Sequence, residues 1–134
     1  MPSPTSLPTT ITPGATTGHV GHSQTIHAAI NTLTTMPTNA YTVSRTAALS
    51  DSGEMVELNS ASALTFTIPP NSAVAFPIGT ILSVSRYGTG AVSVVAGAGV
   101  TIRTSSSLTL RAQYSDASIR KRATDEWVAT GDLS

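Results

Sequence analysis

The sequence contains no cysteine, few aromatic residues and few charges. Without cysteine there is no disulfide framework, no thiolate zinc site and no cysteine nucleophile. Charged residues make up 10% of the 134 residues and the formal net charge is zero. This argues against nucleic-acid binding, because that function needs a basic surface. No run approaches the roughly 20 apolar residues of a membrane helix, and the N-terminus lacks the basic and apolar regions of a secretory signal. We therefore expect neither nucleic acid nor a membrane as a partner.

The residues that are abundant favour a β-rich chain. Hydrophobic residues make up 40% of the sequence, although aromatic residues make up only 4%. That apolar content argues against general disorder, and β-branched and small residues suit a pleated sheet. A soluble domain usually keeps its net charge away from zero. A neutral, weakly charged chain is therefore easier to explain if partners cover much of its surface.

Residues 1–17 are dominated by Thr, Pro, Ser and Gly, and are expected to be extended, because proline blocks helix formation. Such a segment cannot bury a core of its own. It is either a mobile tail or an arm that lies on another molecule. We expect an assembly arm that docks on a partner, and its candidate contact residues are Pro2, Pro4, Leu7, Pro8, Ile11 and Pro13.

Residues 18–36 are predicted to contain one short helix that ends before Pro37. Ile26, Ile30 and Leu33 follow one another at spacings of four and three, as in a helical seam. A helix this short is marginal alone in water. It must pack either on the β domain or against copies of itself.

The three histidines, His19, His22 and His27, all lie in this helical region. A His-rich tract raises the hypothesis of a metal site. Their spacing does not place them on one helix face, and no carboxylate lies nearby in the sequence. We therefore interpret them as capping or seam residues and predict no metal site and no cofactor.

Residues 37–134 alternate apolar and polar side chains over many short segments, which is typical of strands with one buried face. Turn sequences such as Asp51-Ser52-Gly53, Gly88-Thr89-Gly90 and Thr124-Asp125 separate the segments. The pattern predicts a mainly β fold, a small antiparallel β-sandwich or barrel-like domain. Its predicted core residues are Val56, Leu58, Leu64, Phe66, Ile68, Leu82, Val84, Ile102, Leu110 and Trp127.

No combination of residues indicates catalysis, so we predict that the protein is not an enzyme. The glycine pairs lack the third glycine and the following helix of a dinucleotide-binding fingerprint. There is no phosphate-binding P-loop and no G-x-S-x-G nucleophile motif. Most of the seven carboxylates fall in or beside turns, where Asp commonly caps backbone groups.

The single basic run, Arg120-Lys121-Arg122, falls within a predicted strand. Arg120 and Arg122 are expected on one face and Lys121 on the other. The run would either contact an anionic group, such as a neighbouring subunit or a surface polysaccharide, or form a charged outer strand that discourages edge-to-edge aggregation.

Two long segments together resemble a small β domain of tailed-bacteriophage structural proteins. They are VELNSASALTFTIPPNSAVAFPIGTILSVSRYGTGAVSVVAGAGVTI and LTLRAQYSDASIRKRATDEWVATGDL, which lie between Val56 and Leu133. The upstream GHVGHSQTIHAAIN is similar to a helical lead near the start of many phage minor tail and fibre proteins. The resemblance implies a homotrimer at the surface of the virion, with a role in adhesion or decoration and no catalytic residues.

Within that resemblance, the chain lacks the long repeated shaft of a tail fibre. An extended arm followed by a compact domain fits a trimeric capsid decoration or head-fibre protein, whose arm would dock on the major capsid protein. The alternative is a minor tail or tail-fibre component that binds tail proteins and contributes to host adhesion. A host-surface glycan is a further partner that the resemblance allows.

Overall fold

The computed structural model describes residues 35–134, and this part of the protein is mainly β, as the sequence predicts. The expectations for the arm and for helix residues 18–34, including the seam and the histidines, lie outside the described residues. Residues Pro37–Ser134 form one compact unit. One short 3-10 helix covers Leu49–Asp51, and the strands are β1 (Thr38–Tyr41), β2 (Arg45–Thr46), β3 (Met55–Leu58), β4 (Leu64–Ile68), β5 (Ile81–Arg86), β6 (Val92–Ala96), β7 (Thr101–Arg103), β8 (Asp116–Ala123) and β9 (Glu126–Gly131).

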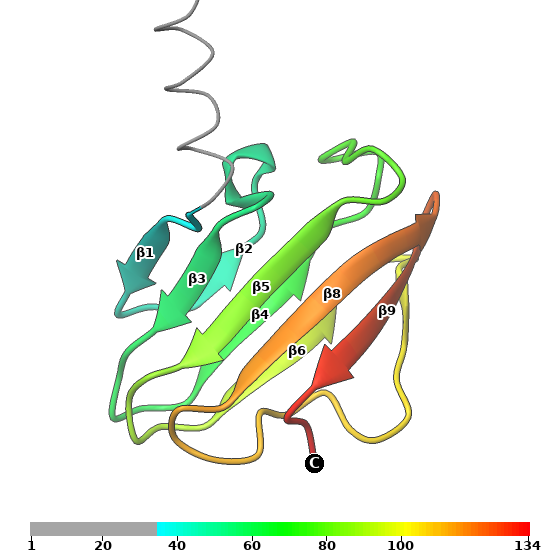
Figure 1. Ribbon diagram of the computed structural model, residues 1–134. Helices are drawn as coiled ribbons and strands as arrows, with labels where there is room; N and C mark the ends of the chain where they lie inside the picture. Colours follow the sequence, from blue (N-terminus) through cyan, green and yellow to red (C-terminus); the bar gives the residue numbers. More distant parts are fainter. Residues whose placement is uncertain (1–34) are drawn as a thin grey trace, which may run out of the picture. The chain divides into compact units, whose positions relative to one another are not determined.

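The strands of this unit form two sheets, one in front of the other in Figure 1. The larger sheet has six strands in the order β1-β3-β5-β8-β9-β7, and the smaller has three in the order β2-β4-β6. From β1 to β6 the chain alternates between the two sheets. The apolar side chains between the sheets therefore come from both layers, as in a sandwich.

The direction of most strands differs from the antiparallel arrangement that the sequence predicts. Five pairs of neighbouring strands run parallel: β1-β3, β3-β5, β2-β4, β4-β6 and β7-β9. Two pairs run antiparallel, β5-β8 and β8-β9. From β1 to β6 the chain winds around the core as a coil, with one strand in each sheet per turn. Successive strands of the same sheet therefore run in the same direction. The alternation of apolar and polar residues does not reveal this, because it reports which face is buried and not which strand is adjacent.

The core lies between the two sheets. Of the predicted core residues, Ile102 is only partly buried and packs against the core, and the others are buried: Val56, Leu58, Leu64, Phe66, Ile68, Leu82, Val84, Leu110 and Trp127. Phe76, which lies in a loop, contacts the Trp127 ring edge to face with 5.5 Å between ring centroids. Aromatic pairs in this geometry stabilise a core by about 0.5–1.5 kcal/mol beyond their buried area.

One segment that alternates apolar and polar residues does not form a strand. Leu108, Leu110 and Ala112 alternate with polar residues, but their segment forms only isolated bridges, Ser93 with Thr109 and Leu110 with Leu133. Leu110 still enters the core. The predicted tight turn at Thr124-Asp125 is confirmed, because it connects β8 to β9.

Candidate assembly surface

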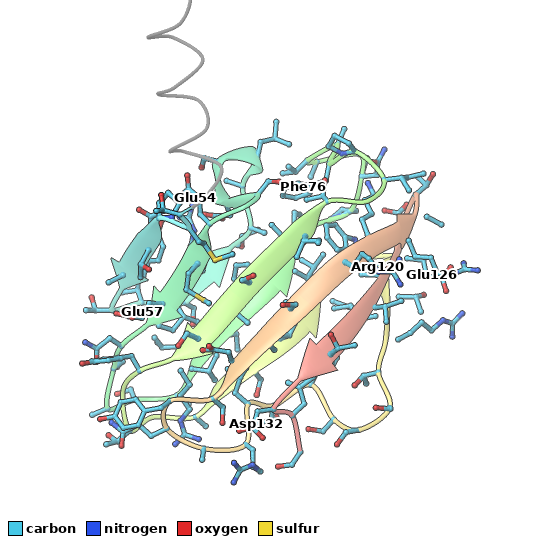
Figure 2. All side chains as sticks on the ribbon, in the orientation of Figure 1. Glu54, Glu57, Phe76, Arg120, Glu126 and Asp132 are labelled. Atoms are coloured by element: carbon cyan, nitrogen blue, oxygen red, sulfur yellow. The ribbon has the colours of Figure 1, made fainter. Side chains whose placement is uncertain are left out.

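The outer face of the six-stranded sheet is the broadest regular surface of the described unit, and its centre carries short side chains. The register aligns Thr38, Met55, Ser83, Ser118 and Thr130 in one row across β1, β3, β5, β8 and β9. In Figure 2 the ribbons of β5 and β8 are almost bare of long side chains on the side facing the viewer. Ser83 is itself buried, at 6% exposure, so the hydroxyl groups that this row exposes are those of Thr38, Ser118 and Thr130.

One end of this face is acidic. Glu57 and Ser85 are aligned across β3 and β5, and Asp116 on β8 pairs with Ser85. Within residues 35–134, neither Glu57 nor Asp116 forms a salt bridge. The two carboxylates therefore add two negative charges without a salt-bridge partner at this end.

The opposite end is basic. Ile81, Arg120 and Val128 are aligned across β5, β8 and β9, and Arg103 on β7 pairs with Val128. Glu126 receives hydrogen bonds from Arg103 Nε and Arg122 Nη1, both at 3.0 Å. The hydrogen bond from Arg103 lowers the pKa of Glu126, and the positive charge of Arg122 acts in the same direction. Among these four charged side chains, the three arginines outnumber the one glutamate.

The unpaired charge at the basic end is Arg120. It is exposed, and it has no salt-bridge partner within the described range. Figure 2 places Arg120 and Glu57 at opposite sides of the sheet. The face thus runs from a basic end through a neutral centre to an acidic end, so that the basic end of one copy complements the acidic end of another.

The size of this face limits what it can do alone. Strands lie about 4.8 Å apart and rise about 3.3 Å per residue, so six strands of β5's length cover a flat area of roughly 500 Å². A stable interface typically buries about 800 Å² on each partner. The face is therefore suited to a weak contact that other contacts reinforce.

The basic run of the sequence does not form an outer strand, so that interpretation is wrong. β8 lies between β5 and β9 in the middle of the large sheet. Arg120 and Arg122 are exposed, and Lys121 points inward with 2% of its surface exposed. The sequence correctly predicted that Arg120 and Arg122 lie on one face of the strand and Lys121 on the other. It did not predict that Glu57, Ser83 and Ser85 share the outer face with Arg120. Only the pairing of β3 with β5 and of β5 with β8 brings them together.

Residues 35–134 contain no group of three His, Asp or Glu side chains placed to hold a metal ion. No helix within that range is long and apolar enough to cross a membrane.

No protein-family model, no curated protein and no solved structure matches this chain.

Proposed function

We propose that this protein is a non-enzymatic structural component of a bacteriophage virion, in which copies of the chain associate through the outer face of the six-stranded sheet. The observation that carries the proposal is the separation of charge on that face, with Arg120 at one end and Glu57 and Asp116 at the other. In this proposal the two ends of the face contact different neighbours, so that Arg120 of one copy lies against the two carboxylates of the next. A head-to-tail contact of this kind closes into a ring when the rotation between copies allows it.

The proposed ring is a homotrimer, as the resemblance to phage structural proteins implies. Because the face is smaller than a standard interface, the trimer needs a second contact. The predicted helical seam at Ile26, Ile30 and Leu33 supplies that contact in this proposal. The arm at residues 1–17 then docks three times on the capsid, which strengthens a weak individual contact through effective concentration.

The test of the assembly contact is a charge swap on the full-length chain. Sedimentation equilibrium should detect a species of three chain masses, and Arg120→Glu should weaken association by at least about tenfold, because like charges then face each other. Combining it with Glu57→Arg and Asp116→Arg should restore association. Thr65→Glu, on the outer face of the small sheet, is the matched control. Unchanged association in Arg120→Glu would exclude this face, and a species of two chain masses would replace the trimer by a dimer.

The test of location is the copy number of the chain in purified virus particles, measured by quantitative mass spectrometry against the major capsid protein. Hundreds of copies per particle would support capsid decoration. A small number in multiples of three would support the tail instead. Absence of the chain from purified particles would reject a virion role.

A further inference from the structure

Two tyrosines form an exposed pair at the end of the sheet where β5 terminates. Tyr87 directly follows β5, and its N–H donates to the carbonyl of Leu58 at 3.0 Å. The rings of Tyr87 and Tyr114 meet nearly edge to face, with 5.5 Å between centroids and 71° between planes. Tyr87 is 48% exposed and Tyr114 is 67% exposed. Two large aromatic side chains are thus held in contact with each other while remaining open to solvent.

Tyr114 occupies a backbone conformation that tyrosine disfavours. Its φ is +73°, and within residues 35–134 it is the only residue other than glycine with a positive φ. The N–H of Ser115 donates to the carbonyl of Ala112 at 3.1 Å and closes a tight turn with Tyr114 in its third position. A positive φ at this position normally selects glycine or asparagine. A strained residue of this kind persists where the surrounding structure holds it, and such residues cluster at functional sites.

Hydrogen bonds hold the turn on both sides. The Tyr114 N–H donates to the carbonyl of Arg86 at 2.6 Å, and the Gln113 side-chain amide donates to the carbonyl of Tyr87 at 3.0 Å. Ser115 Oγ accepts from the Ala112 N–H and donates to Asp132 Oδ2 at 2.6 Å. Asp132 in turn accepts two hydrogen bonds from Arg111. The two rings therefore sit on a preorganised support, which reduces the entropy lost when a ligand binds.

From these observations we propose that Tyr87 and Tyr114 form a carbohydrate-binding site. The apolar C–H face of a pyranose ring stacks on the exposed tyrosine ring, and the amide of Gln113 and the Arg111–Asp132 pair face its hydroxyl groups. Binding sites of this type combine aromatic surface with a few oriented polar groups. A proline-rich peptide would need a groove between aromatic side chains. Here Tyr87 and Tyr114 touch edge to face, so they present the flat face of one ring and no groove between the rings. This proposal does not depend on the assembly proposed above.

The experiment begins with the full-length protein on an array of hexose and N-acetylhexosamine oligosaccharides. The strongest array ligand is then titrated in solution by isothermal calorimetry. Tyr87→Ala and Tyr114→Gly should each weaken binding by at least about tenfold, which corresponds to about 1.4 kcal/mol. Ile78→Ala is the matched control, because Ile78 is also 67% exposed and precedes the opposite end of β5.

Tyr114→Gly separates binding from folding, because glycine accepts the positive φ without strain. This variant should lose binding while its thermal midpoint stays equal to or rises above that of the parent protein. Three results would overturn the proposal: no oligosaccharide binds the array, both tyrosine variants bind like Ile78→Ala, or a proline decapeptide competes for the site while the sugars do not.

Discussion

Lys121 Nζ donates hydrogen bonds to Asn71 Oδ1 at 2.6 Å and to the carbonyl oxygen of Phe76 at 2.7 Å, although Lys121 is almost completely buried. The same nitrogen lies 5.8 Å from the centroid of the Trp127 ring. No carboxylate within residues 35–134 forms a salt bridge with it. The side chain thus joins the middle of β8 to the loop between β4 and β5 and closes this end of the core.

We expect Lys121→Ala to destabilise the protein by about 3 kcal/mol, because it leaves a cavity and an unpaired buried carbonyl. Lys121→Met keeps most of the volume and should cost about 1–2 kcal/mol, from the lost hydrogen bonds alone. Urea denaturation measures both values. Thr65→Ala, at an exposed position of β4 outside the proposed assembly contact, is the control and should change stability by less than about 0.5 kcal/mol. Equal losses in Lys121→Ala and Thr65→Ala would contradict this role.

A second buried interaction holds the first turn of the coil. Asp51, which is 1% exposed, accepts hydrogen bonds from Arg45 Nε and Nη2 and from the Ala48 N–H. The hydrogen bond to Asp51 is the main cause that raises the pKa of Arg45. Arg45 also lies over the Tyr41 ring, 4.3 Å from its centroid. One carboxylate thus connects the end of β1, β2 and the short helix.

Asp51→Ala should therefore cost about 3 kcal/mol, since it leaves an arginine and a backbone N–H without their acceptor. Arg45→Lys keeps the charge but loses the two-point hydrogen bonding, and should cost less, about 1 kcal/mol. Chemical denaturation of both variants gives the comparison. A larger loss in Arg45→Lys than in Asp51→Ala would show that the carboxylate is not the centre of this interaction.

The loops at the opposite end of the core approach so closely that they require glycine. The N–H of Gly90 donates to the carbonyl of Ser60 at 2.8 Å, and a Cβ at Gly90 would overlap the carbonyl of Ser62. We expect Gly90→Ala to cost about 2–3 kcal/mol, because overpacking must displace backbone. Gly99→Ala is the matched control. Gly99 has a φ of +76° but open space around it, so its loss should be only about 1 kcal/mol. Thermal unfolding measures both losses. A larger loss of stability in Gly99→Ala than in Gly90→Ala would contradict this prediction.

Acid should weaken the last strand. Hydrogen bonds from Arg111 and then Ser115 lower the pKa of Asp132, and the hydrogen bond from Arg103 lowers the pKa of Glu126. A carboxyl whose pKa is lower in the folded state stabilises the fold fully above its unfolded value and loses this contribution as pH falls through the folded value. The ordinary values are 3.8 for Asp and 4.5 for Glu.

The thermal midpoint should therefore fall as the pH is lowered below about 4.5, and it should be independent of these two groups near neutral pH. Asp132→Asn should reduce the slope of midpoint against pH. Glu54→Gln is the control, because Glu54 forms no salt bridge within residues 35–134 and lies outside the proposed assembly contact. A slope that Asp132→Asn leaves unchanged would assign the acid sensitivity to other groups.

Local pattern determined a large part of this fold. Alternation of apolar and polar residues assigned inward positions such as Val56, Phe66 and Leu82, and turn residues marked most strand ends. These features depend on neighbouring residues along the chain, where side chains two apart share one face of a strand. The same rule would assign a strand to Leu108 and Ala112, which lie outside the strands. Apolar side chains can pack against the core from a segment that has no continuous ladder of backbone hydrogen bonds.

The pairing of strands was decided only by the tertiary structure. β3 lies beside β5 although β4 separates them in sequence, and β8 inserts between β5 and β9. This pairing collects Glu57, Asp116 and Arg120 on one face, and it brings Tyr87 against Tyr114 from 27 positions away in the chain. A sequence reports which side of each strand is apolar, and that determines what is buried. Which strands become neighbours depends on the packing of the whole core, and that determines which exposed side chains form a surface together.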